Sequence, residues 1–160
     1  MSIEVPWSVL PDYHCFGCSP HNPGGLGLTF TPHPDGVQAV FRLGRAFESY
    51  PGVVHGGLVG VICDETMGNL IVLERRTAAF TVSLRTRFLA PLHVDHEYTC
   101  VARLRGGEGE LIQAEADVLG ADGAVHATAS AGYRPFSLHD ARTALTLADD
   151  ELDLLTRRLS

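Results

Sequence analysis

The sequence has no lysine, few cysteines and little charge of either sign. Its twelve basic residues are all arginines, and 19 acidic residues give a formal net charge of −7. This balance argues against broad binding to a nucleic-acid backbone, since such binding needs a positive surface. Four cysteines in 160 residues are too few and too scattered for a disulfide scaffold. With 45% hydrophobic residues, the composition predicts one globular domain rather than a disordered chain.

A secretory leader and a membrane span are not predicted either. The first residues contain Glu4 and two prolines, without the basic region and apolar stretch of a leader. The longest apolar stretch, residues 53–73, contains Asp64, Glu65 and Asn69. A charge at the middle of a span costs about 2.5–3.5 kcal/mol. We therefore expect no membrane association and a cytoplasmic location.

Residue patterning predicts one buried helix and a mainly antiparallel sheet. Residues 57–73 are too long for a strand and apolar on nearly every side, which is typical of a helix buried in a core. Short breaks at 106–109 and 121–123 separate the later strands, so those strands should be antiparallel neighbours. The expected strands are 26–31, 37–43, 79–89, 97–105, 111–119 and 124–134. We expect an α+β domain in which a curved antiparallel sheet of five to six strands wraps one long central helix.

Three parts of the chain are distinguished by composition. They are an irregular N-terminal arm (1–25), the helix-and-sheet domain (26–136) and a C-terminal tail (137–160). Within the tail, residues 148–159 have acidic residues at the start, two arginines at the end and leucines on one face. This pattern predicts a short amphipathic helix.

The segment from Tyr50 to Glu65 carries the candidate chemistry. Gly56 and Gly57 fall where the helix begins, and a helix N-terminus offers free N–H groups and a partial positive charge. Glycines there let a ligand approach the backbone, which suits a carbonyl oxygen that develops negative charge. Asp64 lies among apolar residues in the middle of the helix, where a carboxylate is costly unless it is paired or used as a base. A purely structural helix start, with an aspartate bonded to a neighbouring strand, is the alternative.

The spacing of these residues constrains the assembly. Gly56 and Asp64 are eight positions apart, so along one helix they lie about 12 Å from each other. One reacting carbon atom cannot contact both groups of the same chain. We predict a two-fold dimer in which each helix brings its Asp64 near the partner's Gly56.

Several motifs together carry a family resemblance. They are Cys15-Phe-Gly-Cys18, Asn22-Pro-Gly-Gly-Leu-Gly-Leu28, Pro51-Gly-Val-Val-His-Gly-Gly57, Asp64 and Phe80-Thr-Val-Ser-Leu-Arg-Thr-Arg-Phe-Leu-Ala-Pro91. Over residues 15–135 the chain resembles the hotdog-fold acyl-CoA thioesterases, in the phenylacetate-degradation-type (PaaI-like) branch. The resemblance implies a hotdog fold, an acyl-CoA substrate and no cofactor apart from the coenzyme A of that substrate.

The resemblance also implies roles for single residues. Asp64 is the general base or the nucleophile, and the Gly56 N–H, together with Gly57, polarises the thioester carbonyl. His55 flanks the carbonyl, and Thr81 orients the water or the acid. Family members form dimers with composite sites and commonly pair these into tetramers, so we expect a homodimer or a dimer of dimers.

Two positions near this motif are less certain in role. Many relatives carry Asn six residues before the histidine of the HGG motif, where this chain has Ser49. The helper hydrogen bond could come from Ser49, from Glu48 or from no residue at all, and this role stays open. Glu65 points about 100° around the helix from Asp64, so only one of the two is expected to reach the site. The family spacing favours Asp64, and Glu65 is expected to hydrogen-bond the sheet.

Arginines on two strands are candidates to bind the phosphates of coenzyme A. Arg85 and Arg87 alternate with apolar residues, and Arg103 and Arg105 share a face of the next strand. Arginine pairs well with phosphate, and by the resemblance Arg87 borders the pantetheine or the nucleotide. A solvated outer face of the sheet is the alternative.

A metal is not predicted. His14, Cys15, Cys18 and His21 offer four zinc-type ligands, but they crowd one segment, whereas structural zinc sites usually draw on two separated pairs. We expect an ordered loop with two thiols, and metal binding by this loop stays open.

Other functions and the acyl pocket are less well determined by the sequence. A hotdog protein that binds acyl-CoA without catalysis is one alternative; a hydratase or dehydratase is another, but the helix has no histidine after Asp64 to act with it. Aromatic residues of the arm are candidates to cover the pocket, namely Trp7, Tyr13 and Phe16. Its far end is expected at the helix residues Met67, Leu70 and Ile71.

Overall fold

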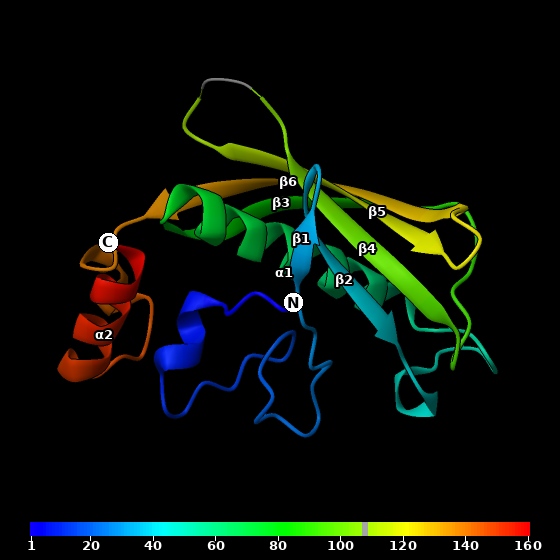
Figure 1. Cartoon of the computed structure of the whole chain (residues 1–160), viewed down its shortest axis with the longest axis horizontal. Coiled ribbons are helices and arrows are strands. Elements are labelled where there is room, and N and C mark those ends of the chain that lie inside the picture. The colour runs from blue at the N-terminus through cyan, green and yellow to red at the C-terminus, as the bar shows by residue number, and fades with distance from the viewer. Residues whose placement is uncertain (107–108) are drawn as a thin grey trace.

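A long helix enclosed by a curved sheet forms the centre of the molecule, in a computed structural model that describes residues 1–106 and 109–160. Figure 1 shows the sheet arching over helix α1 (Gly56–Arg75). The sheet has six antiparallel strands in the order β1-β2-β4-β5-β6-β3. They are β1 (Thr31–His33), β2 (Gly36–Arg42), β3 (Ala78–Phe88), β4 (Glu97–Leu104), β5 (Ile112–Gly120) and β6 (Val125–Phe136). The predicted α+β hotdog fold is thereby confirmed.

Helix α1 has clear local signals at both ends. At its start the His55 side chain accepts a hydrogen bond from the Gly57 N–H (3.0 Å), and at its end Arg76 adopts a left-handed conformation (φ 54°). The helix is long and apolar enough to cross a membrane. A helix that packs inside a protein core has the same character, and Ile62 and Met67 of α1 are fully buried beneath the sheet.

Small side chains let the sheet approach α1 closely. Three cross-strand pairs of β4, β5 and β6 are alanine opposite alanine, namely Ala102–Ala116, Ala116–Ala129 and Ala114–Ala131. Residues directly opposite one another share one face of a sheet. The buried alanines of these strands are Ala102, Ala114, Ala116, Ala127, Ala129 and Ala131. A face of alanines leaves room for the larger side chains of the helix, which accounts for the tight packing.

The N-terminal arm and the C-terminal helix lie side by side below α1 (Figure 1). The arm contains a short 3-10 helix, η1 (Pro6–Val9), on which α2 (Asp149–Leu159) packs. Leu155 of α2 is fully buried, and Arg158 pairs with Glu4 of the arm (2.9 Å). The remaining 3-10 helices are η2 (Arg45–Phe47) and η3 (Asp140–Thr143). The amphipathic helix predicted at 148–159 therefore joins the arm rather than the sheet.

The first predicted strand is wrong in position. Residues 26–31 were expected in the sheet, but β1 begins only at Thr31. The N–H groups of Leu26 and Leu28 instead bond to carbonyls of Phe16 and Gly17 (2.7 and 2.9 Å). The arm thus takes the hydrogen bonds that a neighbouring strand would have taken. The predicted break at 106–109 includes residues 107 and 108, which lie outside the described residues.

Candidate active site

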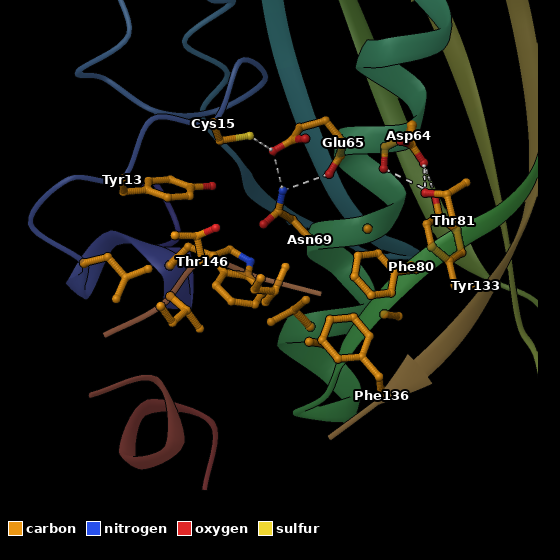
Figure 2. A pocket seen from close by; sticks show the side chains of 18 residues that line it. Tyr13, Cys15, Asp64, Glu65, Asn69, Phe80, Thr81, Tyr133, Phe136 and Thr146 are labelled. Carbon is orange, nitrogen blue, oxygen red and sulfur yellow. Dashed lines mark hydrogen bonds between the residues drawn. The ribbon is translucent and has the colours of Figure 1, made fainter. Parts of the chain in front are cut away.

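The Asp64 carboxylate is held by two hydroxyl groups from the sheet (Figure 2). Thr81 Oγ1, at the start of β3, and the Tyr133 hydroxyl, near the end of β6, both donate to Asp64 Oδ1 at 2.8 Å. Tyr133 also lies 3.2 Å from the Asp64 backbone carbonyl. The paired strands β3 and β6 place Thr81 opposite Tyr133 in register. The structure therefore brings Asp64 and Thr81 together within one chain.

Tyr133 is a site residue that the sequence reasoning missed. It continues the inward alternation of Ala127, Ala129 and Ala131, and it is 1% exposed. A tyrosine among inward-facing alanines needs a partner for its hydroxyl, and that mismatch was the available signal. Burial and then the nearby Asp64 charge raise the pKa of Tyr133 above its ordinary value, so its hydroxyl stays protonated and donates.

Asp64 lies on the wall of a cavity of about 440 Å³ (Figure 2). The cavity is bounded by α1, by the paired ends of β3 and β6, by the arm and by the tail. Phe80 and Phe136 stack on one side (ring centroids 4.2 Å apart). The other apolar lining residues are Trp7, Leu10, Val72, Ala78, Ala79, Leu145 and Leu147. Most of the cavity wall is therefore apolar, with polar groups at the Asp64 end.

Two sets of residues were expected to line the pocket, and only members of the first set line this cavity. Of the arm aromatics, Trp7 and Tyr13 line this cavity, whereas Phe16 is not among the lining residues. The helix residues expected at its far end, Met67, Leu70 and Ile71, are instead buried in the core. They lie on the face of α1 that packs under the sheet, whereas the cavity opens on the face toward the arm.

Glu65 also faces the cavity, contrary to expectation. Its Oε1 accepts hydrogen bonds from the Cys15 thiol (3.3 Å) and from Asn69 Nδ2 (3.1 Å), so it bonds the arm and its own helix rather than the sheet. Burial raises the pKa of Glu65 to about 7, and Cys15 adds to the increase. Asp64 and Glu65 both line the cavity because it extends around the helix from β3 to the arm.

The two thiols of the arm converge with Glu65. Ligand atoms of Cys15, Cys18 and Glu65 lie within 4.8 Å of one another. The Tyr13 hydroxyl lies 2.8 Å from Cys18 Sγ. A hydrogen bond from Cys18 lowers the pKa of the Cys15 thiol to about 5, with help from the Gly17 backbone N–H and against the effect of burial.

The residues at the start of α1 line a different cavity. His55 is exposed, and its Nδ1 already binds the Gly57 N–H. Gly56 and Ser49 line a cavity of about 370 Å³ together with Phe88, and Ser49 Oγ bonds the Val53 carbonyl (3.4 Å). Within one chain, these residues are therefore separated from Asp64 and Thr81.

The arginines lie on the outer face of the sheet. Arg85 and Arg87 line a groove of about 320 Å³ with Arg103, Glu115 and Asp117. The charge of Arg103 is met by Glu115 (2.9 Å) and Asp117 (2.8 Å). The groove is on the opposite side of the sheet from Asp64.

Comparison with protein families gives one match. Residues 51–126, just under half of the chain, match the family model of the thioesterase superfamily. The matched segment contains His55, Gly56, Asp64 and Thr81, whereas Tyr133 and the arm lie outside it. A search of curated proteins finds no match.

Solved structures, several of them of thioesterases, share the fold. A thioesterase superfamily protein is 24% identical with a TM-score of 0.70, covering 76% of this chain, and this chain spans only 62% of its length. AziG of S. sahachiroi is 23% identical (TM-score 0.63; 69% of this chain and 92% of AziG). A hypothetical thioesterase of Streptococcus pneumoniae, solved with coenzyme A, is 18% identical (TM-score 0.62; 69% and 89%). Two further structures of the pneumococcal protein carry an aspartate-to-alanine or a threonine-to-alanine replacement.

Proposed function

We propose that this protein hydrolyses an acyl-CoA thioester to a free acid and coenzyme A. The observation that carries the proposal is the Asp64 carboxylate, held by Thr81 and Tyr133 on the wall of a largely apolar cavity. The superfamily match includes Asp64 and Thr81, and the similar pneumococcal protein was solved with coenzyme A. The sequence motifs favour the phenylacetate-degradation-type branch.

The two hydroxyl groups fix the carboxylate for reaction. They occupy Asp64 Oδ1, and no described residue donates to Oδ2. In the general-base route, Oδ2 takes a proton from a water molecule as the water oxygen adds to the thioester carbonyl carbon. The oxyanion then collapses, the C–S bond breaks, and coenzyme A leaves as the thiolate. In the nucleophilic route, an Asp64 carboxylate oxygen adds to the carbonyl carbon, and the C–S bond breaks as coenzyme A leaves as the thiolate. Water then hydrolyses the resulting mixed anhydride to the free acid and the Asp64 carboxylate.

A partner chain completes the site in this proposal. The oxyanion needs an N–H donor, and the candidate is Gly56, which is about 12 Å along the helix from Asp64. A second copy, packed along the β3 edge, would bring its own Gly56 to this Asp64. In support, β3 is an edge strand with exposed apolar side chains, and such edges are normally covered. These exposed side chains are Phe80, Val82, Leu84 and Phe88.

The remaining predicted contacts stay proposals of the same kind. His55 and Ser49 would flank the substrate at the start of the partner's helix α1. In this arrangement His55 Nδ1 accepts the hydrogen bond from the Gly57 N–H. Arg85 and Arg87 would take the phosphates of coenzyme A where the substrate passes around the β3 edge.

Thiol release from short-chain, long-chain and aromatic acyl-CoA substrates tests the proposal. We expect hydrolysis of at least one class, and a fall in kcat of about 10²- to 10⁴-fold for Asp64→Asn. Asp153→Asn, an exposed position on α2, is the matched control and should retain full activity. Acyl-CoA binding without thiol release would support the non-catalytic alternative, and water addition to an enoyl-CoA would support the hydratase.

A further inference from the structure

We propose that Cys15, Cys18 and Glu65 form a binding site for a thiophilic divalent cation of the zinc class, with an open coordination position toward the cavity. Figure 2 shows Cys15 pointing at Glu65 across the gap between the arm and α1. The Cys15 sulfur lies 3.3 Å from Glu65 Oε1, and the three ligand atoms all lie within 4.8 Å of one another. Ligands of one tetrahedral zinc lie about 3.3–3.8 Å apart, given bonds of about 2.0–2.3 Å.

The sequence argued against a metal site because its four candidate ligands crowd one segment. The three ligands that converge in the structure do not all come from that segment. His14 and His21, the histidines of the crowded segment, are exposed, and neither is in the cluster. The third ligand comes from the middle of α1, far from the thiols in sequence. The site therefore joins two separate elements, as metal sites usually do.

The arm is built to approach Glu65 closely. A Cβ atom added at Gly17, between the two cysteines, would lie 2.5 Å from Glu65 Cγ and 2.6 Å from Glu65 Oε2. Glycine therefore lets the turn rest on the carboxylate in its present position, and a larger residue would displace Glu65. Main-chain bonds hold the turn itself, since Ser19 N–H donates to the Cys15 carbonyl (3.0 Å). Both thiols are thus carried on a fixed turn.

Neighbouring polar groups orient the ligands. Asn69 Nδ2 donates to the Glu65 carboxylate (3.1 Å) and to the Glu65 backbone carbonyl (2.9 Å), and the Tyr13 hydroxyl bonds Cys18. Supporting contacts of this kind are typical of metal sites. The same Asn69 is 5% exposed, and its Oδ1 has no hydrogen-bond partner among the described residues. Water bound to a metal is a hydrogen-bond donor, which is the kind of group that Oδ1 lacks.

The ligand set selects the type of cation. Thiolates favour zinc-class and other thiophilic ions over magnesium or calcium. Two thiolates and one carboxylate make three protein ligands, the number that catalytic zinc sites use when the fourth position is left for water or substrate. Cys15 and Glu65 line the same cavity as Asp64, so this fourth position faces the cavity. Both cysteines bind as thiolates, so any thiol proton still present is released to solvent on binding.

Cobalt titration tests the site without any assay of hydrolysis. Protein without a histidine tag is stripped of metal and titrated anaerobically with Co²⁺ in a phosphine reductant. We expect one equivalent per chain, a thiolate-to-cobalt charge-transfer band, and displacement of the cobalt by Zn²⁺. Cys15→Ser and Cys18→Ser should each lose tight binding, Asn69→Ala should weaken it about 10- to 100-fold, and Cys100→Ala in the core should leave it unchanged.

A second measurement needs no variant. Trypsin cleaves after arginine, so Cys15 and Cys18 fall in the peptide 1–42, apart from Cys63 and Cys100. One equivalent of Zn²⁺ should protect peptide 1–42 from thiol alkylation in the folded protein. Cobalt bound without the thiolate band, binding that survives Cys15→Ser, or no protection of peptide 1–42 would each overturn the proposal.

Discussion

At the scale of single residues, the site depends on how Asp64 is held. Oδ1 accepts from one hydroxyl on each of two paired strands, so a shift of either strand would turn the carboxylate. Tyr133 is almost completely buried, whereas Thr81 is exposed. The two donors therefore differ in how much they depend on core packing.

Replacing Tyr133 with phenylalanine should separate positioning from binding. The variant keeps the ring in place and removes one hydrogen bond to a charged group, worth about 1.5–3 kcal/mol. We expect kcat to fall about 10- to 100-fold while KM stays nearly constant. Tyr98→Phe is the control, because Tyr98 is also buried and its hydroxyl accepts from the His93 N–H (2.8 Å) away from Asp64. Equal losses of kcat in the two variants would reduce Tyr133 to a structural role.

The sequence could predict only part of this site. The family motif predicted that Asp64 and Thr81 act in the same reaction, because both residues lie within the segment that the motif covers. Tyr133 and the tail residues around the cavity lie outside that pattern and reach the site only through strand pairing and chain folding. Glu65 was expected to hydrogen-bond the sheet. Helix geometry gives the direction of its side chain, but it does not give the position of the arm that this side chain contacts.

At the scale of elements, β3 presents different chemistry on its two faces. Thr81 faces α1, while Arg85 and Arg87 face the outer groove. The strand is also at the edge of the sheet. In the proposed function, β3 therefore holds Asp64 on one face, binds the nucleotide on the other and contacts the partner chain along its edge.

The role of the outer face can be tested with a shortened substrate. If Arg87 binds a phosphate of coenzyme A, Arg87→Ala should raise KM for the acyl-CoA about fivefold, equivalent to about 1 kcal/mol. The N-acetylcysteamine thioester of the same acid lacks the nucleotide, so its KM should not change. Arg157→Ala, exposed on α2, should alter neither value. Equal changes for both substrates would remove Arg87 from nucleotide binding.

The docking of the arm depends on a single glycine. Gly17→Ala places a methyl group against Glu65, so we expect a loss of about 1–3 kcal/mol in the free energy of unfolding. Trp7, the one tryptophan, lies in the arm, and its fluorescence should shift to the red as the arm loosens. In Gly24→Ala the added methyl group meets only Asn22 Oδ1 at an ordinary 3.6 Å, so this control should match the wild type. An unchanged melting curve and emission in Gly17→Ala would mean that Glu65 moves aside without cost.

Element prediction succeeded where burial alone decides the structure and failed where tertiary contacts compete. Helix α1 and the strands from β2 onward follow from apolar runs and alternation. The segment 26–31 has a similar apolar pattern, but its N–H groups bond the arm. No local pattern distinguishes these two partners.

At the scale of the whole molecule, the proposed chemistry is incomplete in one chain. Asp64 and Thr81 lie on one cavity and Gly56 on another, while the apolar edge strand β3 offers a surface for a second copy. A stable monomer with full activity would contradict the composite site directly.

Complementation between two inactive variants gives the sharpest test of the assembly. Asp64→Asn removes the base, and Gly56→Pro removes the N–H proposed to bind the oxyanion. Proline is well tolerated at the first position of a helix. His55, which precedes it, has φ −58° and ψ 127°, in the region favoured before proline. No described residue accepts a bond from the Gly56 N–H, so the variant should fold.

In a composite two-fold dimer, a mixed pair of these variants contains one intact site and one doubly damaged site. Random pairing makes half of the dimers mixed, so co-expressed variants should recover about a quarter of the wild-type activity. If base and oxyanion donor belonged to the same chain, every site in the mixture would carry one defect and no activity would return. Wild-type protein co-expressed with an inactive double variant gives the complementary result. Both sites of a mixed dimer are damaged if the site is composite, so about a quarter of the wild-type activity per chain should remain, whereas about half should remain if each site lies within one chain. Recovery of about a quarter of the wild-type activity therefore depends only on whether the Asp64 and the Gly56 N–H of one site come from different chains.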